Sequence, residues 1–401
     1  MPHVLVLSTL YPNPANPRFG AFVARSMENL ASRTHWTVSV INPLGLPPLG
    51  IGGLSSRYRG LMDLPEEAEE GGIAVHRPRF TLIPRIGARR NPDAVASAAL
   101  PIARAIHADT PVDLVDAQFF FPDGPAAAIL ARSLGKPLSI KARGSDITYW
   151  SRFDFARKAM REAAQQASGL FAVSAALADE AAARLGVERS GFTVHHTGLD
   201  RDRFRPFGHT QLRAQLSREL GFALPDAAPI LASVGALIKR KGHHIAIEAL
   251  TRLPPEHSDA RLLVVGKGEE EATLRNLASE LGLAERVHFT GSVDHDLLPL
   301  LLSAADIMVL PTANEGLANV WVEALACGTP VVTCDVGGAR DVIASRVAGR
   351  LVERTPAAVA AGVEAVLSDP PDPQAVAAIA ERFDWTAHAH ELAARYDQLI
   401  A

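Results

Sequence analysis

Cysteine is scarce in this chain: Cys327 and Cys334 are the only two in 401 residues. So few thiols are not typical of a secreted scaffold held together by disulfides, and they point instead to the reducing cytoplasm. We expect both thiols to be reduced and buried, on either side of the start of one predicted strand.

An excess of positive charge is missing as well. The formal net charge is −4 and the sequence pI is near 6.4, whereas a general nucleic-acid binder needs a concentrated basic face. No nucleic-acid partner is therefore expected. The composition, with 48% hydrophobic, 21% charged and 6% aromatic residues, is that of an ordinary globular protein, and 401 residues allow two domains with separate cores.

Hydrophobic segments of the kind that target or anchor a protein are also lacking. The apolar run His3 to Leu7 has no basic residues before it and is interrupted by Ser8 and Thr9, so it predicts a first strand rather than a signal peptide. Residues 37–56 carry no charge, but seven of them are glycine or proline. A spanning helix is therefore excluded there, and a strand followed by an apolar loop is expected.

Predicted strands and helices alternate along the whole chain, which is the pattern of parallel sheets with crossover helices. Strands are predicted at 3–7, 36–41, 114–117, 138–141, 170–173, 193–195, 230–234, 261–265, 287–290, 307–310 and 330–333. Helices are predicted at 21–32, 125–134, 175–185, 244–250, 269–281, 296–304, 318–327, 340–344 and about 386–400.

This alternation predicts an α/β protein with two Rossmann-like domains that face a cleft. The boundary is placed near Phe204-Arg205-Pro206, where a strand and turn end and a polar helix begins. The first domain then covers residues 1–205 and the second covers residues 206–383.

The most informative segment is Asn314 to Val332, which places two carboxylates eight residues apart. Glu315 follows the buried strand predicted at 307–310, and Glu323 lies inside the next helix. Ligands of open α/β sheets bind at the carboxyl ends of strands. Glu315 can accept hydrogen bonds from sugar hydroxyls, Glu323 can take the paired hydroxyls of a ribose, and the helix N-terminus offers N–H groups to phosphate. This arrangement suits a nucleotide-sugar; the alternative is two unrelated surface acids.

A second motif places three adjacent cations, Lys239, Arg240 and Lys241, after the strand predicted at 230–234. Fixed cations at this position can neutralise a pyrophosphate and the negative charge that develops on a leaving nucleoside diphosphate. The alternative is a solvated basic turn. Further along the chain, Gly266 lies in a turn that lets the backbone approach a ligand closely.

The segment from Glu315 to Val332 resembles the E-G-x-x-N-V-x-x-E-A-x-A-x-G-x-P-V-V signature of family 4 glycosyltransferases. These enzymes have the two-domain GT-B fold and transfer a sugar from a nucleotide donor with retention of configuration. The resemblance implies that Glu315 contacts the donor sugar and Glu323 the ribose. It also implies that the last helix, 384–401, crosses back to the N-terminal domain.

The same resemblance implies further donor contacts. Backbone N–H groups between the two glutamates would hold the diphosphate and the sugar, and Lys241 matches the donor-phosphate lysine. The other residues implied in donor binding are Gly20, Arg240, Gly266, Val293, Gly316, Leu317, Asn319 and Val320. Ala236 departs from the family, which often has arginine there, and Arg240 or Lys239 can substitute for it. No metal or other cofactor is required if Lys241, its neighbours and helix dipoles stabilise the leaving diphosphate.

Arg143-Gly144-Ser145-Asp146 resembles the H-G-x-D segment of the family, with Arg143 in place of the histidine near the anomeric centre. Arginine stays protonated and cannot act as a general base. This agrees with a front-face mechanism, in which the departing phosphate accepts the acceptor's proton. Asp146 either orients the acceptor hydroxyl or caps a helix.

Membrane contact is predicted from residues 76–90, which contain five arginines, no acids and several large apolar residues. Such a segment suits an anionic membrane surface, although an ordinary solvated strand and loop is the alternative. It would place the protein in the cytoplasm, peripheral to the inner membrane.

The sequence therefore predicts a retaining glycosyltransferase of surface polysaccharide or glycolipid assembly, with a UDP- or GDP-sugar donor and a glycan or lipid-linked acceptor. Two alternatives stay open. A GT-B sugar-nucleotide 2-epimerase would bind the same donor without an acceptor, and a non-catalytic subunit would bind a nucleotide-sugar without turnover.

Overall fold

The computed structural model divides into two compact units. The first consists of Met1–Gly198 with Trp385–Ala401, and the second is Leu199–Asp384. The structure describes residues 1–17, 19–48, 56–82, 87–225, 227–294 and 296–401. Residues 199–205 group with the second unit, because Leu199 and Phe204 are buried in its core and the N–H of Leu199 donates to the carbonyl of Phe383 (2.6 Å).

The first unit is built on an eight-stranded sheet of order β10-β9-β8-β7-β1-β2-β5-β4. Neighbouring strands are parallel except for the antiparallel pair β4 and β5. Its strands are β1 (His3–Leu7), β2 (Thr37–Ile41), β4 (Glu67–Glu70), β5 (Ile73–His76), β7 (Leu114–Ala117), β8 (Leu138–Ala142), β9 (Gly169–Ala172) and β10 (Phe192–Val194). A separate parallel pair joins β3 (Leu44–Leu46) and β6 (Arg79–Thr81).

Central strands of this sheet are buried along their whole length, as strands covered on both faces must be. All residues of β1, β7 and β8 are buried. The flanking helices are α1 (Ala21–Arg33), α2 (Ser56–Met62), α3 (Asn91–Asp109), α4 (Asp123–Leu134), α5 (Ser145–Thr148), α6 (Asp154–Gln166), α7 (Ala175–Leu185) and α16 (Trp385–Ile400), with short 3-10 turns η2 (Gly87–Arg90), η3 (Trp150–Arg152) and η4 (Arg189–Gly191).

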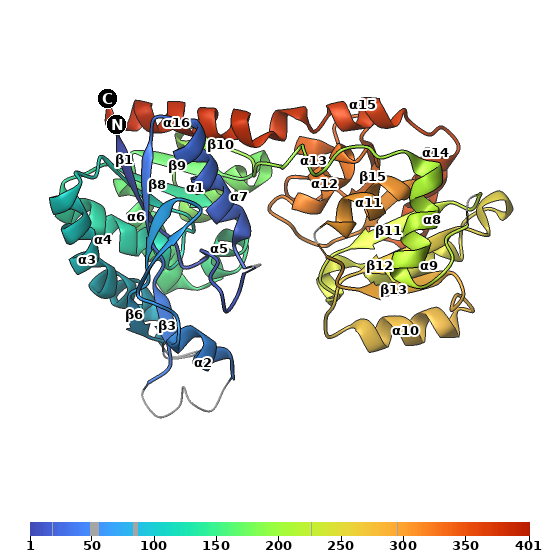
Figure 1. Cartoon of the computed structure of the whole chain (residues 1–401), viewed down its shortest axis with the longest axis horizontal. Helices are drawn as coiled ribbons and strands as arrows, with labels where there is room; N and C mark the ends of the chain where they lie inside the picture. Colours follow the sequence, from blue (N-terminus) through green and yellow to red (C-terminus); the bar gives the residue numbers. More distant parts are fainter. Residues whose placement is uncertain (18, 49–55, 83–86, 226, 295) are drawn as a thin grey trace. The chain divides into compact units, whose positions relative to one another are not determined.

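The C-terminal helix α16 packs beside α1 in the first unit, although the whole second unit separates the two in the sequence (Figure 1). Trp36 fixes it there: its indole Nε1 donates to Asp397 Oδ1 (3.0 Å) and its ring meets Tyr396 edge-on at 5.4 Å. Leu392 and Tyr396 complete the apolar contact. The prediction that the last helix returns to the N-terminal domain is confirmed.

The second unit has a six-stranded parallel sheet of order β13-β12-β11-β14-β15-β16. Its strands are β11 (Ile230–Val234), β12 (Arg261–Val265), β13 (Val287–Gly291), β14 (Ile307–Leu310), β15 (Val331–Cys334) and β16 (Gly349–Val352). Both cysteines are buried and free, Cys334 at the end of β15 and Cys327 three residues before that strand's preceding proline.

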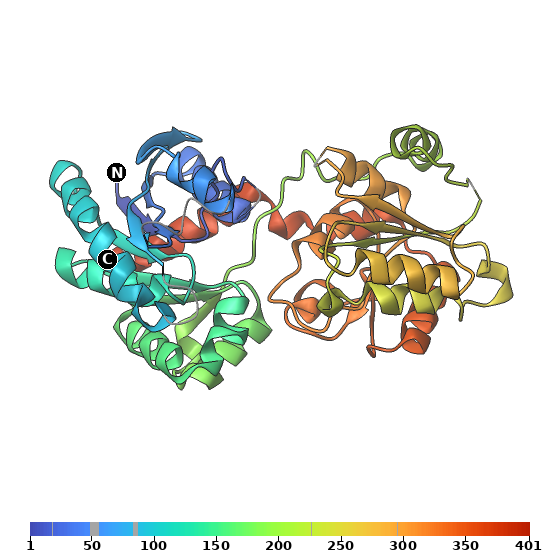
Figure 2. The ribbon, with the colours of Figure 1, turned by 90° about the horizontal axis from the view of Figure 1, so that it is seen from below.

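Helices cover both faces of this sheet, and Figure 2 shows the two layers on its opposite sides. One apolar core lies under α8 (His209–Leu220), α11 (Leu297–Ala304), α12 (Asn319–Ala326), α13 (Ala339–Val342) and α15 (Pro373–Ala378). The other lies under α9 (His243–Leu250), α10 (Glu271–Glu280) and α14 (Pro356–Leu367). Three 3-10 turns are η5 (Lys239–Lys241), η6 (Pro255–His257) and η7 (Glu381–Phe383).

Each sheet reverses its winding direction once. In the first unit the reversal lies between β1 and β7, and in the second between β11 and β14. The loops that leave the two strands at such a point turn away from each other, and ligands of doubly wound sheets bind in the space that this opens at the carboxyl ends. The topology therefore singles out the loops after β11 and β14.

We predict that Leu392→Ala destabilises the first unit by about 2–5 kcal/mol, because it removes a buried side chain that joins α16 to the core. Urea unfolding followed by circular dichroism measures the loss. Glu391→Ala, at an exposed position of the same helix, is the control and should unfold like the wild type. Equal midpoints for both variants would contradict this view of how α16 is held.

Candidate functional site in the second unit

Glu315 lies in the loop between β14 and α12, at the carboxyl end of the sheet. Its side chain is 11% exposed. Thr333 on the neighbouring strand β15 donates its hydroxyl to the carbonyl of Leu310 (2.6 Å), which fixes the point where the loop leaves β14. The carboxylate is therefore held at a defined place rather than carried on a free surface loop.

Three donors converge on one oxygen of Glu315. Lys241 Nζ lies 2.6 Å from Oε1, Arg240 Nη1 lies 2.9 Å from it, and the Thr312 hydroxyl donates to it over 3.0 Å. Lys241 is 14% exposed and Arg240 is 43% exposed. Since the two cations follow β11 and Glu315 follows β14, this charge cluster bridges the reversal point of the sheet.

Backbone contacts lock the two loops together. Gly242 has a φ of +79°, and a Cβ on it would fall 2.2 Å from the carbonyl oxygen of Pro311, so only glycine fits. The N–H of Ala313 donates to the carbonyl of Arg240 (2.9 Å), and Arg354 Nε donates to the carbonyl of Pro311 (2.9 Å). The cations thus reach Glu315 from a rigid base.

His243 supports the cationic loop from below. Its Nδ1 lies 2.9 Å from the Ser233 hydroxyl and its Nε2 lies 3.2 Å from the carbonyl of Ala236. Burial lowers the pKa of His243 to about 4, so the ring is neutral near pH 7. It bridges the end of β11 and the start of the loop, which is a structural role.

Glycines bring the neighbouring loops into backbone contact. Gly266, with a φ of +140°, packs so close to Gly235 that an added Cβ would lie 1.9 Å from the Gly235 oxygen, and its N–H donates to the carbonyl of Gly291 (2.8 Å). Gly337 packs against Glu315 in the same way, since a Cβ added to it would lie 1.7 Å from the carbonyl oxygen of Glu315. The loops after five successive strands thus form one continuous edge around Glu315.

The start of α12 offers backbone N–H groups beside this edge. Its N-cap is Ala318, without a side-chain cap, and its first turn carries no acid. Leu317 and Val320 are half-buried and pack part of their side chains on the core, while Asn319 is exposed. Glu323 is half-buried one turn further along the helix.

Two other predicted positions lie beside these loops. Gly316 accepts a hydrogen bond at its carbonyl from the N–H of Gly338 (2.7 Å), which ties the Glu315 loop to the turn after β15. Val293 follows the β13 loop and packs its side chain on the core that also holds α12. Of the predicted donor-site residues, Lys241, Arg240 and Glu315 are in direct side-chain contact, and Gly316 and Val293 lie in the neighbouring loops.

Residues missed from the sequence complete the cluster. Thr312, which bonds Glu315, and Arg354, which fastens the Pro311 and Lys239 carbonyls, carry no motif of their own. The spacing Leu310-Pro311-Thr312 before Glu315 was the only available sign of Thr312. Arg354 lies far along the chain, after β16, and nothing in the sequence pairs it with this loop.

Two of the residues predicted in the first unit, Gly20 and Asp146, lie in close backbone contacts. Gly20, with a φ of +70°, opens α1 and abuts the backbone of Leu10, where a Cβ would lie 1.5 Å from the carbonyl oxygen. Asp146 is fully buried and accepts N–H groups of Phe120 (2.9 Å) and Gly144 (2.7 Å). Both carboxylate oxygens are thus occupied by backbone N–H groups, and Asp146 is not the N-cap of α5, which is Gly144.

Arg143 is held at the end of β8 by a side chain that sequence reasoning missed. Its Nη2 donates to Gln118 Oε1, and its guanidinium lies 4.9 Å from the ring centre of Phe22 in α1. Burial lowers the pKa of Arg143 to about 10, so it stays charged near pH 7. The position is therefore cationic and cannot supply a base.

The arginine-rich segment 76–90 divides in the structure. Arg77 is buried and pairs with Glu70 (2.5 Å), and Arg79 donates to the carbonyls of Met62 (2.9 Å) and Leu64 (3.0 Å). Arg85 lies outside the described residues. Arg79, Arg89 and Arg90 are the exposed arginines among the described residues of the segment, and Arg79 is engaged by the fold through its bonds to the two carbonyls.

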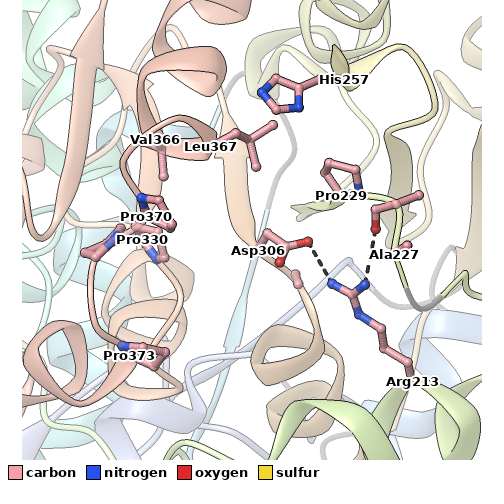
Figure 3. A pocket seen from close by; sticks show the side chains of 14 residues that line it. Arg213, Ala227, Pro229, His257, Asp306, Pro330, Val366, Leu367, Pro370 and Pro373 are labelled. Atoms are coloured by element: carbon pink, nitrogen blue, oxygen red, sulfur yellow. Dashed lines mark hydrogen bonds and ion pairs between the residues drawn. The ribbon is translucent and has the colours of Figure 1, made fainter.

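A cavity of about 410 Å³ opens elsewhere in the second unit, and Figure 3 shows it. Arg213 pairs there with Asp306 (2.8 Å), while Pro229, Pro330 and His257 lie around it. Because Pro229, Asp306 and Pro330 directly precede β11, β14 and β15, this cavity lies at the amino ends of the strands. It is therefore remote from the charge cluster at their carboxyl ends.

Comparison with known proteins agrees with this geometry. Residues 57–203 match the model described as Glycosyltransferase Family 4, and residues 221–383 match Glycosyl transferases group 1. The chain is 31% identical over 268 residues to the GDP-mannose-dependent alpha-(1-6)-phosphatidylinositol monomannoside mannosyltransferase of Mycolicibacterium smegmatis, covering 64% of this chain and 68% of that protein. It is 29% identical over 338 residues to the putative teichuronic acid biosynthesis glycosyltransferase TuaC of Bacillus subtilis, covering 84% and 81%.

Solved structures share the fold over the whole chain. HepE of Anabaena in complex with UDP has a TM-score of 0.73 and 21% identity, covering 99% of this chain and all of that one. Sucrose-phosphate synthase of Thermosynechococcus elongatus has a TM-score of 0.74 and 22% identity, covering 100% and 99%. Two α/β units of this kind, one with its charge cluster at the sheet reversal, define a glycosyltransferase of the GT-B fold. The chain belongs to glycosyltransferase family 4.

No helix in the described part of the chain combines the length and the apolar character that are needed to cross a membrane.

We predict that His243→Gln makes the second unit less sensitive to acid. A buried histidine with a depressed pKa contributes stability that is present above its unfolded pKa of about 6.5 and is lost as the pH falls through its folded value. For His243 this stability is lost between the unfolded pKa of about 6.5 and the folded pKa of about 4. Between pH 7.5 and 4.5 the wild type should lose roughly 1–3 kcal/mol more than the variant in urea unfolding.

The half-exposed His257 of the same unit provides the matched control. His257→Gln should keep the acid sensitivity of the wild type. If His243→Gln showed the same pH dependence as that control, burial of His243 would not be the cause.

Proposed function

We propose that this protein is a retaining glycosyltransferase that moves a sugar from a UDP- or GDP-sugar to a glycan or lipid-linked acceptor. The observation that carries the proposal is the convergence of Lys241 and Arg240 on Glu315 at the sheet reversal. The same place holds the N-terminus of α12, which carries no side-chain cap. Acid, cations and backbone donors are the groups that a sugar bound to a diphosphate needs.

In this proposal the cationic side chains bind the diphosphate of the donor, and the acidic side chains bind its hydroxyl groups. Lys241 and Arg240 outnumber the single carboxylate that they share, so the cluster keeps an excess positive charge. This excess would attract a diphosphate and stabilise the charge that it gains as the glycosidic bond breaks. Glu315 would accept hydrogen bonds from sugar hydroxyls, and Glu323 on α12 would accept those of the ribose.

Relatives support both nucleotide choices. The Mycolicibacterium smegmatis enzyme is named as GDP-mannose-dependent, and HepE was solved with UDP. Gly266 and Val293 would lie beside the nucleotide base. Backbone contacts to the diphosphate and the sugar would come from Gly316, Leu317, Asn319 and Val320. The second unit would thus bind the donor, and the first unit, with Gly20 near the diphosphate, would bind the acceptor.

Retention would follow a front-face course. Arg143 is charged and braced by Gln118 and Phe22, so it would stabilise negative charge rather than remove a proton. The departing phosphate oxygen would then take the proton of the acceptor hydroxyl as the new glycosidic bond forms on the same face. We place this reaction in surface polysaccharide or glycolipid assembly in the cytoplasm, with peripheral contact to the inner membrane.

A panel of UDP-, GDP- and ADP-sugars tests the proposal. Incubation with each donor, with and without crude lipid and glycan acceptors, should give nucleoside diphosphate release from one donor class and an α-configured product from an α-linked donor. Release of an epimerised donor would indicate the 2-epimerase alternative. Binding without any turnover across the panel would indicate a non-catalytic subunit.

We predict that Lys241→Met lowers kcat by about 10²–10³, because it removes a cation from the developing diphosphate charge. Glu315→Gln, which keeps the shape of the side chain, should lower kcat/KM at least tenfold while calorimetry still detects nucleoside diphosphate binding. The exposed ion pair of Glu271 and Arg275 offers a control in the same unit. Glu271→Gln should keep wild-type activity, and full activity of Lys241→Met would overturn the assigned roles.

A further inference from the structure

An exposed group of aromatic side chains lies on the first unit, at the end of α5 and in the segment that follows it. Tyr149 is 49% exposed and Phe153 is 39% exposed. Their rings are 5.4 Å apart, and Trp150 contacts both, at 5.3 and 5.8 Å. Phe155 continues the group at 5.8 Å from Phe153. Exposed aromatic rings in mutual contact are unusual on a surface that meets only water.

Cations surround these rings. A shallow groove of about 500 Å³ is lined by Phe153 and Phe155 together with Arg89, Arg152 and Lys158, and Asp154 is the single acid in this lining. We call these residues, with Tyr149 and Trp150, the aromatic-cationic patch. Three cations against one acid give its groove a net positive charge.

The cations of the patch are not neutralised by the fold. Among the described residues, Arg89 and Arg152 form no ion pair, and Lys158 has only a loose contact of 3.9 Å with Glu162. Asp154 is already paired with Arg157 (2.5 Å). The positive charge of the groove is therefore available to an external anionic partner.

The patch is mounted on a rigid base. Trp150 rests on the buried ring of Phe121 at 4.8 Å, and Phe155 meets the same ring at 6.0 Å. The Ser151 hydroxyl donates to the carbonyl of Ile147 (2.5 Å), which ties η3 to α5. The exposed rings are thus held outward by their buried neighbours and lose little freedom when a partner covers them.

We propose that the aromatic-cationic patch docks on the surface of an anionic phospholipid bilayer. Amphipathic aromatic rings belong at the boundary between headgroups and acyl chains, and exposed lysine and arginine are attracted to anionic headgroups. Tyr149 and Phe153 insert at the boundary, while Arg89, Arg152 and Lys158 contact lipid phosphates. This proposal names the surface that makes the peripheral membrane contact of the proposed function. It rests on the proposed function only for the purpose of that contact, and membrane binding itself can be tested without it.

A bilayer fits the patch better than a protein partner does. Two exposed rings rimmed by exposed cations offer little apolar area, whereas stable protein interfaces bury a broad surface with a core depleted of charge. Exposed Arg90, beside Arg89 in η2, extends the positive rim. A flat anionic surface can meet the whole rim at once.

Sedimentation with vesicles of phosphatidylcholine, with or without phosphatidylglycerol, tests the proposal on the full chain. The wild type should bind the anionic vesicles, release them at high salt because the attraction is screened, and ignore pure phosphatidylcholine. Tyr149→Ser/Phe153→Ser and, separately, Arg152→Glu/Lys158→Glu should each weaken binding about tenfold or more. Circular dichroism confirms that each variant is folded.

A matched control carries the same charge change on the other unit. Arg218→Glu/Arg252→Glu, at exposed positions of the second unit, should bind vesicles within about twofold of the wild type. If it lost binding equally, general charge rather than the patch would be responsible, and the proposal would fail. Binding of both patch variants at the wild-type level, or no vesicle binding by the wild type, would overturn it too.

Two further readouts separate this proposal from others. Donor turnover with a water-soluble acceptor should be unchanged in the patch variants, so vesicle binding and the proposed function can fail independently. A patch that captured soluble acidic oligosaccharides and not vesicles would instead be an acceptor subsite, which would contradict the membrane assignment.

Discussion

One buried arrangement of charge governs the second unit: a single carboxylate oxygen of Glu315 receives Lys241, Arg240 and Thr312. The partners come from loops that leave β11 and β14 in opposite directions. Separating the two loops would leave a largely buried charge without its partner, which is costly, so the ion pairs hold the loops at a fixed distance. Helix α12 begins directly after the Glu315 loop, so the ion pairs also fix the position of its backbone N–H groups.

Glycine decides the shape of the edge around this cluster as much as charge does. A Cβ at Gly242, Gly266 or Gly337 would fall within 2.2 Å of a carbonyl oxygen of another loop. Such close backbone contacts leave no room for side chains and turn five separate loops into one surface. A ligand that binds there meets backbone groups and the few long side chains that reach over them.

In the first unit the loops after the strands are held together by buried acids that bind backbone and hydroxyl groups, rather than by ion pairs. Asp146 spends both carboxylate oxygens on backbone N–H groups, and Asp123 accepts the N–H and hydroxyl of Thr9 across the sheet reversal (2.9 and 2.7 Å). Burial raises the pKa of Asp123 to about 7. Acids that follow strands in this unit therefore stabilise loops. Arg143, which donates to Gln118, remains positively charged near pH 7.

The sequence by itself determined most of the alternating elements, because buried parallel strands are continuous apolar runs and their helices begin and end at recognisable residues. The return of α16 was implied only by the resemblance to family 4 glycosyltransferases. The sequence also indicated Glu315, Lys241 and Arg240, whose motifs follow strands directly. It did not delimit α3, α6 or α14, whose alanine-rich patterns carry weak boundaries. Only the tertiary structure decided that Arg77 is buried, that Asp146 serves the backbone and that Thr312 and Arg354 complete the cluster. These outcomes depend on which strands become neighbours, and strand order is a property of the folded sheet that no local pattern encodes.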